Sequence, residues 1–81
     1  MRITERETHI TFIVGLQKDL HNLIFNKNSI IQIINILISD GTLEFPKQTK
    51  HLKSLKKEIS KKNPDESKIK KIINSIKATN E

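Results

Sequence analysis

The apolar residues of this chain recur at three- and four-residue steps in separate segments, and this spacing constrains the fold more than any other feature. An α-helix turns once in roughly 3.6 residues, so that this spacing places the apolar side chains along one face. We therefore predict an all-α fold, an antiparallel four-helix bundle that forms a single domain over residues 1–81. The helices are expected over residues 4–25, 30–39, 46–61 and 64–77.

The second of these segments fits either a helix or a strand. Its apolar residues cover nearly the whole circumference of a helix, which is typical of a central helix. A short β-branched run also fits a buried strand. We favour a helix because the chain offers no second convincing strand to pair with it.

The boundaries of the predicted helices follow from capping residues. Asn28 or Ser29 is expected to cap the second helix, and Gly41 to end it in the left-handed conformation. Pro46 suits the first position of the third helix. Residues 63–66 offer an asparagine cap, a proline at the first helical position and two acids in the first turn.

Composition excludes several classes of protein. The chain has no cysteine, so that a disulfide framework and a thiolate metal site are both excluded. No secretory signal follows the charged start of the sequence. The most apolar segment, residues 30–38, is far shorter than the about 20 residues that a bilayer span needs. We expect a cytoplasmic location and leave open an attachment to the inner face of the membrane.

Catalytic chemistry has little support in the sequence. His9, His21 and His51 are dispersed, and we interpret them as surface or flanking residues. Gly15 and Gly41 are the only glycines, so that there is no glycine-rich phosphate loop. We predict a protein that is not an enzyme and has no catalytic residues, no metal site and no cofactor.

The charge of the chain lies in its second half. Residues 1–41 carry four basic and four acidic side chains, whereas residues 42–81 carry eleven lysines against five acids and so account for the net charge of +6. Three interpretations of these lysines stay open: a solvated face, a nucleic-acid surface, or a surface for a protein or an anionic membrane. Nucleic acid is the less supported partner, because Gln48 is the only residue of the third helix suited to base readout and no Tyr or Trp is present to stack on bases.

The segment from Leu23 to Ile59 resembles the enterocin A immunity type of bacteriocin immunity proteins, which protect producers of pediocin-like (class IIa) bacteriocins. The residues that carry the resemblance are those at the end of the first helix, the glycine turn, the aromatic-proline opening of the third helix and its apolar spine: Leu23, Ile24, Phe25, Asn26, Asp40, Gly41, Phe45, Pro46, Lys47, Leu52, Leu55 and Ile59. This chain is shorter than is usual in the family, its second helix is abbreviated, and its C-terminal tail is short. In that family the C-terminal half and tail are associated with recognition of the cognate bacteriocin. Because the tail is short here, we expect recognition through the third and fourth helices instead.

The resemblance implies a soluble helical bundle that joins the bacteriocin-engaged membrane part of a mannose phosphotransferase permease from the cytoplasmic side. We expect such a protein partner, with an anionic membrane surface as an additional contact, and a monomer or weak homodimer. The expected contact residues are Lys50, Lys53, Lys57, Lys61, Lys70, Lys71, Asn74 and Lys77. The alternative is a small, dimeric helical regulator that binds DNA, because residues 26–38 also resemble small connector proteins of the biofilm-regulator type.

Overall fold

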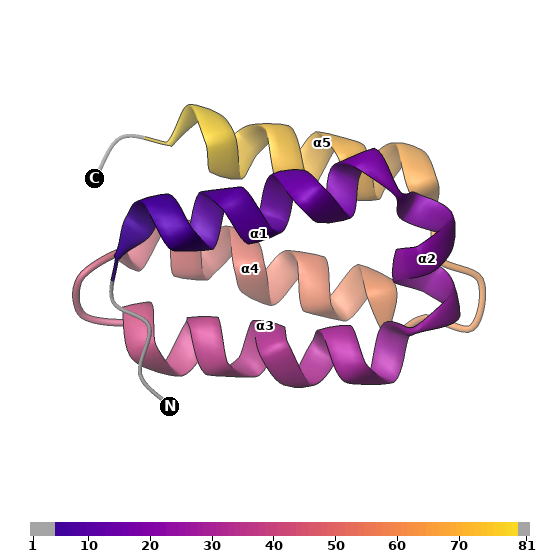
Figure 1. Ribbon diagram of the computed structural model, residues 1–81, viewed down its shortest axis with the longest axis horizontal. Helices are drawn as coiled ribbons and strands as arrows, with labels where there is room; N and C mark the ends of the chain where they lie inside the picture. The colour runs from indigo at the N-terminus through magenta and orange to yellow at the C-terminus, as the bar shows by residue number, and fades with distance from the viewer. Residues whose placement is uncertain (1–4, 80–81) are drawn as a thin grey trace.

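The computed structural model describes residues 5–79, which form five α-helices and no β-strand (Figure 1). The helices are α1 (Arg6–Lys18), α2 (Leu20–Phe25), α3 (Lys27–Gly41), α4 (Pro46–Ile59) and α5 (Glu66–Ala78). The predicted all-α class is confirmed, and the segment that also fitted a strand is helical. The prediction of four helices is wrong in number for the described residues, since there are five.

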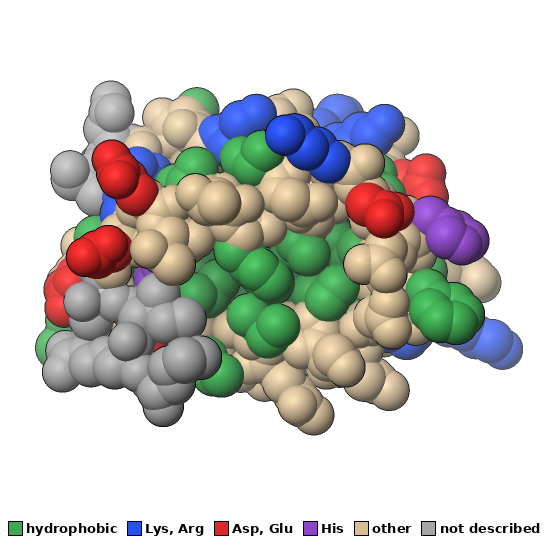
Figure 2. Space-filling model, in the orientation of Figure 1, with side chains coloured by type: hydrophobic (Ala, Val, Ile, Leu, Met, Phe, Trp, Pro, Cys, Tyr) green, Lys and Arg blue, Asp and Glu red, His purple; other side chains and the backbone are tan. Residues whose placement is uncertain are grey.

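Four of the five helices are 13 to 15 residues long, and the chain reverses direction from each of these to the next (Figure 1). α4 packs between α3 and α5, and α1 packs against α5. The six-residue α2 joins the end of α1 to the start of α3. α1 and α3 are not packed closely along their length, and apolar side chains are visible between them (Figure 2).

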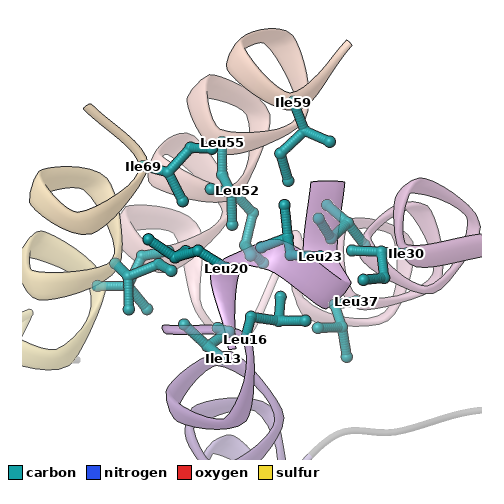
Figure 3. Packing of buried hydrophobic residues seen from close by; sticks show 13 residues of the cluster. Ile13, Leu16, Leu20, Leu23, Ile30, Leu37, Leu52, Leu55, Ile59 and Ile69 are labelled. Atoms are coloured by element: carbon teal, nitrogen blue, oxygen red, sulfur yellow. The ribbon is translucent and has the colours of Figure 1, made fainter. Parts of the chain in front are cut away.

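The core is aliphatic and draws on all five helices. Figure 3 shows these side chains meeting in one interior cluster. Its buried members are Ile13, Leu16, Leu20, Leu23, Ile30, Ile34, Leu37, Leu52, Leu55, Ile59, Ile69, Ile73 and Ile76. All of them belong to the apolar residues that the spacing marks. The expectation of a central second helix is wrong, however, because α3 packs mainly against α4 and Ile33 is 37% exposed. Phe12 is partly buried against this cluster.

The first predicted helix is broken at Asp19, which is the reason for the fifth helix. The backbone of Asp19 leaves the helical region (φ −136°, ψ 75°), and its side chain accepts a hydrogen bond from the N–H of Asn22 at 3.0 Å. Aspartate competes in this way for backbone donors and therefore favours helix starts over helix interiors. The break redirects the chain while Leu20 and Leu23 stay in the core.

The boundaries predicted for the second helix are wrong at both ends. α3 begins at Lys27, so that Asn28 and Ser29 lie inside its first turn, and the capping position is held by Asn26 without a side-chain cap. At the other end Gly41 is the last helical residue, and no glycine of the described chain has a positive φ. Gly41 is buried, and its lack of a side chain makes room for the Phe45 ring instead.

The third helix begins at Pro46 as predicted but ends at Ile59, before the predicted residue 61. The fourth predicted helix, now α5, begins two residues later than expected. Its capping residue is Asp65, whose carboxylate accepts hydrogen bonds from the N–H of Ser67 at 2.9 Å and of Lys68 at 3.4 Å. Residues 63 and 64 therefore lie in the connection, and the carboxylate takes the role that the asparagine was expected to have.

One side-chain contact joins the start of the described chain to its end. The guanidinium of Arg6 in α1 donates hydrogen bonds to the carbonyl oxygens of Ile76 and Thr79. Ile76 lies in the last turn of α5 and Thr79 directly follows the helix, where the helix dipole favours a cation. Arg6 therefore fixes α1 beside α5 and completes the C-terminal end of α5.

Substitution of each of the two glycines is expected to change the free energy of unfolding in an opposite direction. Nothing lies within 4 Å of a Cβ built at Gly15, so that G15A is expected to raise the free energy of unfolding by about 0.5–1 kcal/mol through helix propensity. A Cβ at Gly41 would meet Phe45 Cδ2 at 3.3 Å and His9 Cε1 at 3.4 Å. G41V is therefore expected to lower the free energy of unfolding by about 1–3 kcal/mol through overpacking. Urea denaturation followed by circular dichroism measures both values, and a destabilising G15A would contradict the structure.

Candidate partner-binding surface

The lysines of α4 form a line on its outer side. Lys50, Lys53 and Lys57 are exposed and follow one another at i, i+3 and i+7. Two of them, together with the half-buried Lys56, border a surface pocket of about 380 Å³ between α3 and α4, which we call the α3–α4 groove. The groove is lined by Asn35, Ile38, Lys53, Lys56, Lys57 and Ser60.

The expected contact residues of α5 lie mostly on a different side of the molecule. Lys70, Asn74 and Lys77 share one side of α5 at i, i+4 and i+7. This side faces α1, because Gln17 of α1 donates to Asn74 Oδ1 at 2.8 Å and accepts from Lys77 Nζ at 3.4 Å. Lys71 projects away from α1 and is exposed. The predicted single lysine face is therefore divided, with one group beside α3 and another beside α1.

Figure 2 shows lysine and arginine side chains gathered along the edge that α5 forms, above a face that is largely apolar and uncharged between α1 and α3. The first half of the chain carries no net charge, and most of this face belongs to it. The division of the basic groups follows from the order of packing, in which α4 and α5 each have a different second neighbour.

Lys61 lies outside α4 and serves the connection to α5. Its Nζ forms an ion pair with Glu58 Oε1 at 3.0 Å, and the other carboxylate oxygen accepts from the N–H of Asp65 at 3.1 Å. The hydrogen bond from the Asp65 backbone, followed by the one from Lys61, lowers the pKa of Glu58. Glu58 thus holds the α4–α5 connection, a role that the sequence analysis did not assign to it.

A second polar cluster is buried where α1 meets the start of α4. His9 and Gln48 are fully buried, with His9 Nδ1 and Gln48 Nε2 2.6 Å apart. The His9 ring also meets the Phe45 ring edge-on, with centroids 5.4 Å apart. The interpretation of His9 as a surface or flanking residue is wrong, and Gln48 is not placed to read a nucleic-acid base.

Helical spacing could have revealed this second cluster. His9 precedes the core residue Ile13 by four positions, and Gln48 precedes Leu52 by four, so that each lies on the apolar stripe of its helix. Glu58 could not be found in this way, because it borders the stripe and its partners lie in a connection. The other histidines agree better with the prediction, since His21 is exposed and His51 half-buried.

Among residues 5–79, three large hydrophobic side chains are exposed. Leu43 is 93% exposed in the α3–α4 connection, Phe25 is 80% exposed at the end of α2, and Ile33 is 37% exposed on α3. Within residues 5–79 no three side chains of His, Asp or Glu lie together in a way that could hold a metal ion. No helix in this part of the chain is long and apolar enough to span a bilayer.

Comparisons with protein-family models, with curated proteins and with solved structures found no match to the chain. The resemblance to immunity proteins therefore stays a prediction from the sequence, and its implications are proposals.

The lowered pKa of Glu58 predicts how stability depends on pH. A carboxyl whose pKa is lower in the folded state stabilises that state above its ordinary value of 4.5, and the contribution is lost as the pH falls through the folded-state pKa. E58Q is therefore expected to be less stable than the wild type at neutral pH, with a difference that shrinks as the pH falls below 4.5 and through the folded-state pKa. Urea midpoints across this range measure the effect.

E66Q is the matched control, because Glu66 is an exposed acid in the first turn of α5. Its difference from the wild type should be smaller at neutral pH. A pH-independent deficit in E58Q would mean that the carboxylate acts through its shape and not through its charge.

Proposed function

We propose that this protein is a bacteriocin immunity protein, which protects a cell against a pediocin-like bacteriocin by binding the bacteriocin-engaged receptor, a mannose phosphotransferase permease, from the cytoplasmic side. In this proposal α1 and α2 together correspond to a single, broken first helix. The five helices then make the antiparallel four-helix bundle that the family resemblance implies. The alternation of direction among α1, α3, α4 and α5 supports this correspondence (Figure 1).

The observation that carries the proposal is the start of α4. Pro46 begins this helix and Phe45 holds the capping position, so that the aromatic-proline pair opens a long helix at the place where the resemblance requires it. The Phe45 ring is fixed against the buried His9, which ties this opening to α1. The pair therefore begins α4 and holds its start against α1. This supports the proposal that it corresponds to the aromatic-proline opening of the family.

The exposed lysines support a stoichiometric role at a membrane-bound partner. Lys50, Lys53 and Lys57 on α4 and Lys70 and Lys71 on α5 are all exposed. Lysine supplies long-range attraction and a fast association rate more than geometric specificity. The proposal assigns contact with the permease complex to these residues, together with Lys61, Asn74 and Lys77, and assigns a protective and not a catalytic role to the protein.

Expression in a bacteriocin-sensitive strain tests the proposal. Cells that express the chain should survive at least one member of a panel of pediocin-like bacteriocins, measured as a rise in the inhibitory concentration. The variant K50Q/K71Q, with one change on each lysine-bearing helix, should lower that concentration because it weakens attraction to the partner. The matched variant K18Q/K68Q removes the same charge from positions outside the proposed contact set and should protect like the wild type.

Two outcomes would overturn this proposal. One is the absence of protection against every bacteriocin of the panel when the folded protein is present in the cells. The other is steep, salt-dependent binding to duplex DNA in a mobility-shift assay near physiological ionic strength, which would instead favour the small DNA-binding regulator.

A further inference from the structure

The α3–α4 groove combines an apolar floor with positive charge on one wall. Ile38 of α3 is half-buried at its base, and Lys53, Lys56 and Lys57 of α4 stand along its edge. Lys56 is itself half-buried, so that its methylene stem covers part of the apolar surface while its ammonium group reaches water. Asn35 and Ser60 are the neutral polar residues of the lining.

The three lysines stand at i, i+3 and i+4 and are neighbours on the helix surface. Within residues 5–79 none of their ammonium groups forms an ion pair. Like charges at this spacing oppose helix formation. A ligand that brings negative charge to this wall would relieve the repulsion, which gives the groove a preference for an anion.

Among residues 5–79, no carboxylate is placed to supply this charge. The lining contains no acidic residue. Glu58, the acid of α4, is turned toward the connection to α5, where it accepts hydrogen bonds from Lys61 and Asp65. Asp40, the acid of α3, lines a separate pocket with Glu44. Within the described part of the chain the basic wall has no acidic complement, which favours an acidic group of another molecule as its partner.

We propose that the α3–α4 groove binds an acidic peptide segment of a protein partner, with one apolar side chain placed on Ile38 and flanking carboxylates placed at Lys53, Lys56 and Lys57. Asn35 and Ser60 offer hydrogen-bonding groups that suit the backbone of such a segment. This inference adds detail to the proposed function. It rests on that function in one respect, which is that the partner is a protein.

A peptide fits the groove better than a lipid surface does. Membrane-surface helices combine lysines with large exposed apolar side chains that enter the lipid. The two most exposed apolar residues, Phe25 and Leu43, are not part of the groove lining. The groove is also concave, with a volume of about 380 Å³ that is suited to a single side chain and its neighbours.

The test is a titration of the full chain with a fluorescent peptide that has one leucine between two pairs of glutamates, followed by fluorescence anisotropy. A second peptide has serine in place of the leucine, and a third has lysines in place of the glutamates. The first peptide should bind most tightly. Amide NMR spectra of the isotope-labelled chain should show shifts that concentrate at Asn35, Ile38 and Lys53–Lys57.

The variant K53Q/K57Q should weaken binding of the leucine peptide by about tenfold, since it removes two of the three charges at the groove. The control K18Q/K68Q changes the net charge equally and should weaken binding by less than about twofold. All four positions are exposed, so the substitutions should leave the core intact. The circular dichroism spectrum of each variant checks that the helices are retained.

Three outcomes would overturn the groove proposal. The first is an equal loss of affinity in the two variants, which would mean general charge attraction. The second is equal binding of the leucine and serine peptides. The third is that the chain binds phosphatidylglycerol vesicles and does not bind the leucine peptide, and that K53Q/K57Q abolishes the binding to vesicles. Because the titration contains neither bacteriocin nor permease, a negative result here overturns the groove alone, and a failed protection assay overturns the proposed function alone.

Discussion

The apolar stripe of α4 is the constraint on which the rest of the structure depends. Leu52, Leu55 and Ile59 are completely buried, and α4 is the helix that packs against both α3 and α5. Truncating one such residue to alanine typically costs about 2–5 kcal/mol, a large part of the stability of so small a domain. Most other positions of α4 are polar, so that a narrow stripe holds this helix in place. The remaining circumference is therefore free to carry lysine at little cost to the core.

Polar side chains act mainly at the ends of the helices, where the apolar core cannot satisfy the backbone. Asp19 supplies the cap of α2, and Asp65 supplies the cap of α5. Glu58 fixes the connection between α4 and α5 through the Asp65 N–H and Lys61. These contacts fix the connections between successive helices and thereby contribute to which neighbour each side of α4 and α5 faces. The division of the basic surface is a consequence of this placement.

Local spacing in the sequence was sufficient to predict the helical class and the buried residues, because helical spacing within each segment brings them to one face. The break at Asp19 keeps Leu20 and Leu23 in the core although it divides the first segment into two helices. It was not sufficient for features that depend on contacts between helices. Gly41 was expected to end α3 with a left-handed turn, but its use is to leave space for Phe45 and His9, which come from other segments. Similarly, a projection of α4 and α5 taken separately predicts outward-facing lysines. It does not reveal that Asn74 and Lys77 are turned toward Gln17 of α1.

The contact between Arg6 and the last turn of α5 spans 70 positions of sequence to Ile76, nearly the whole length of the chain. A contact of such separation has a larger loop-closure entropy than shorter-range pairs such as α3–α4 and α4–α5, and we expect it to form later in folding than they do. A contact that forms late slows unfolding more than it speeds folding. We therefore expect Arg6 to slow the opening of the folded molecule more than it speeds its assembly.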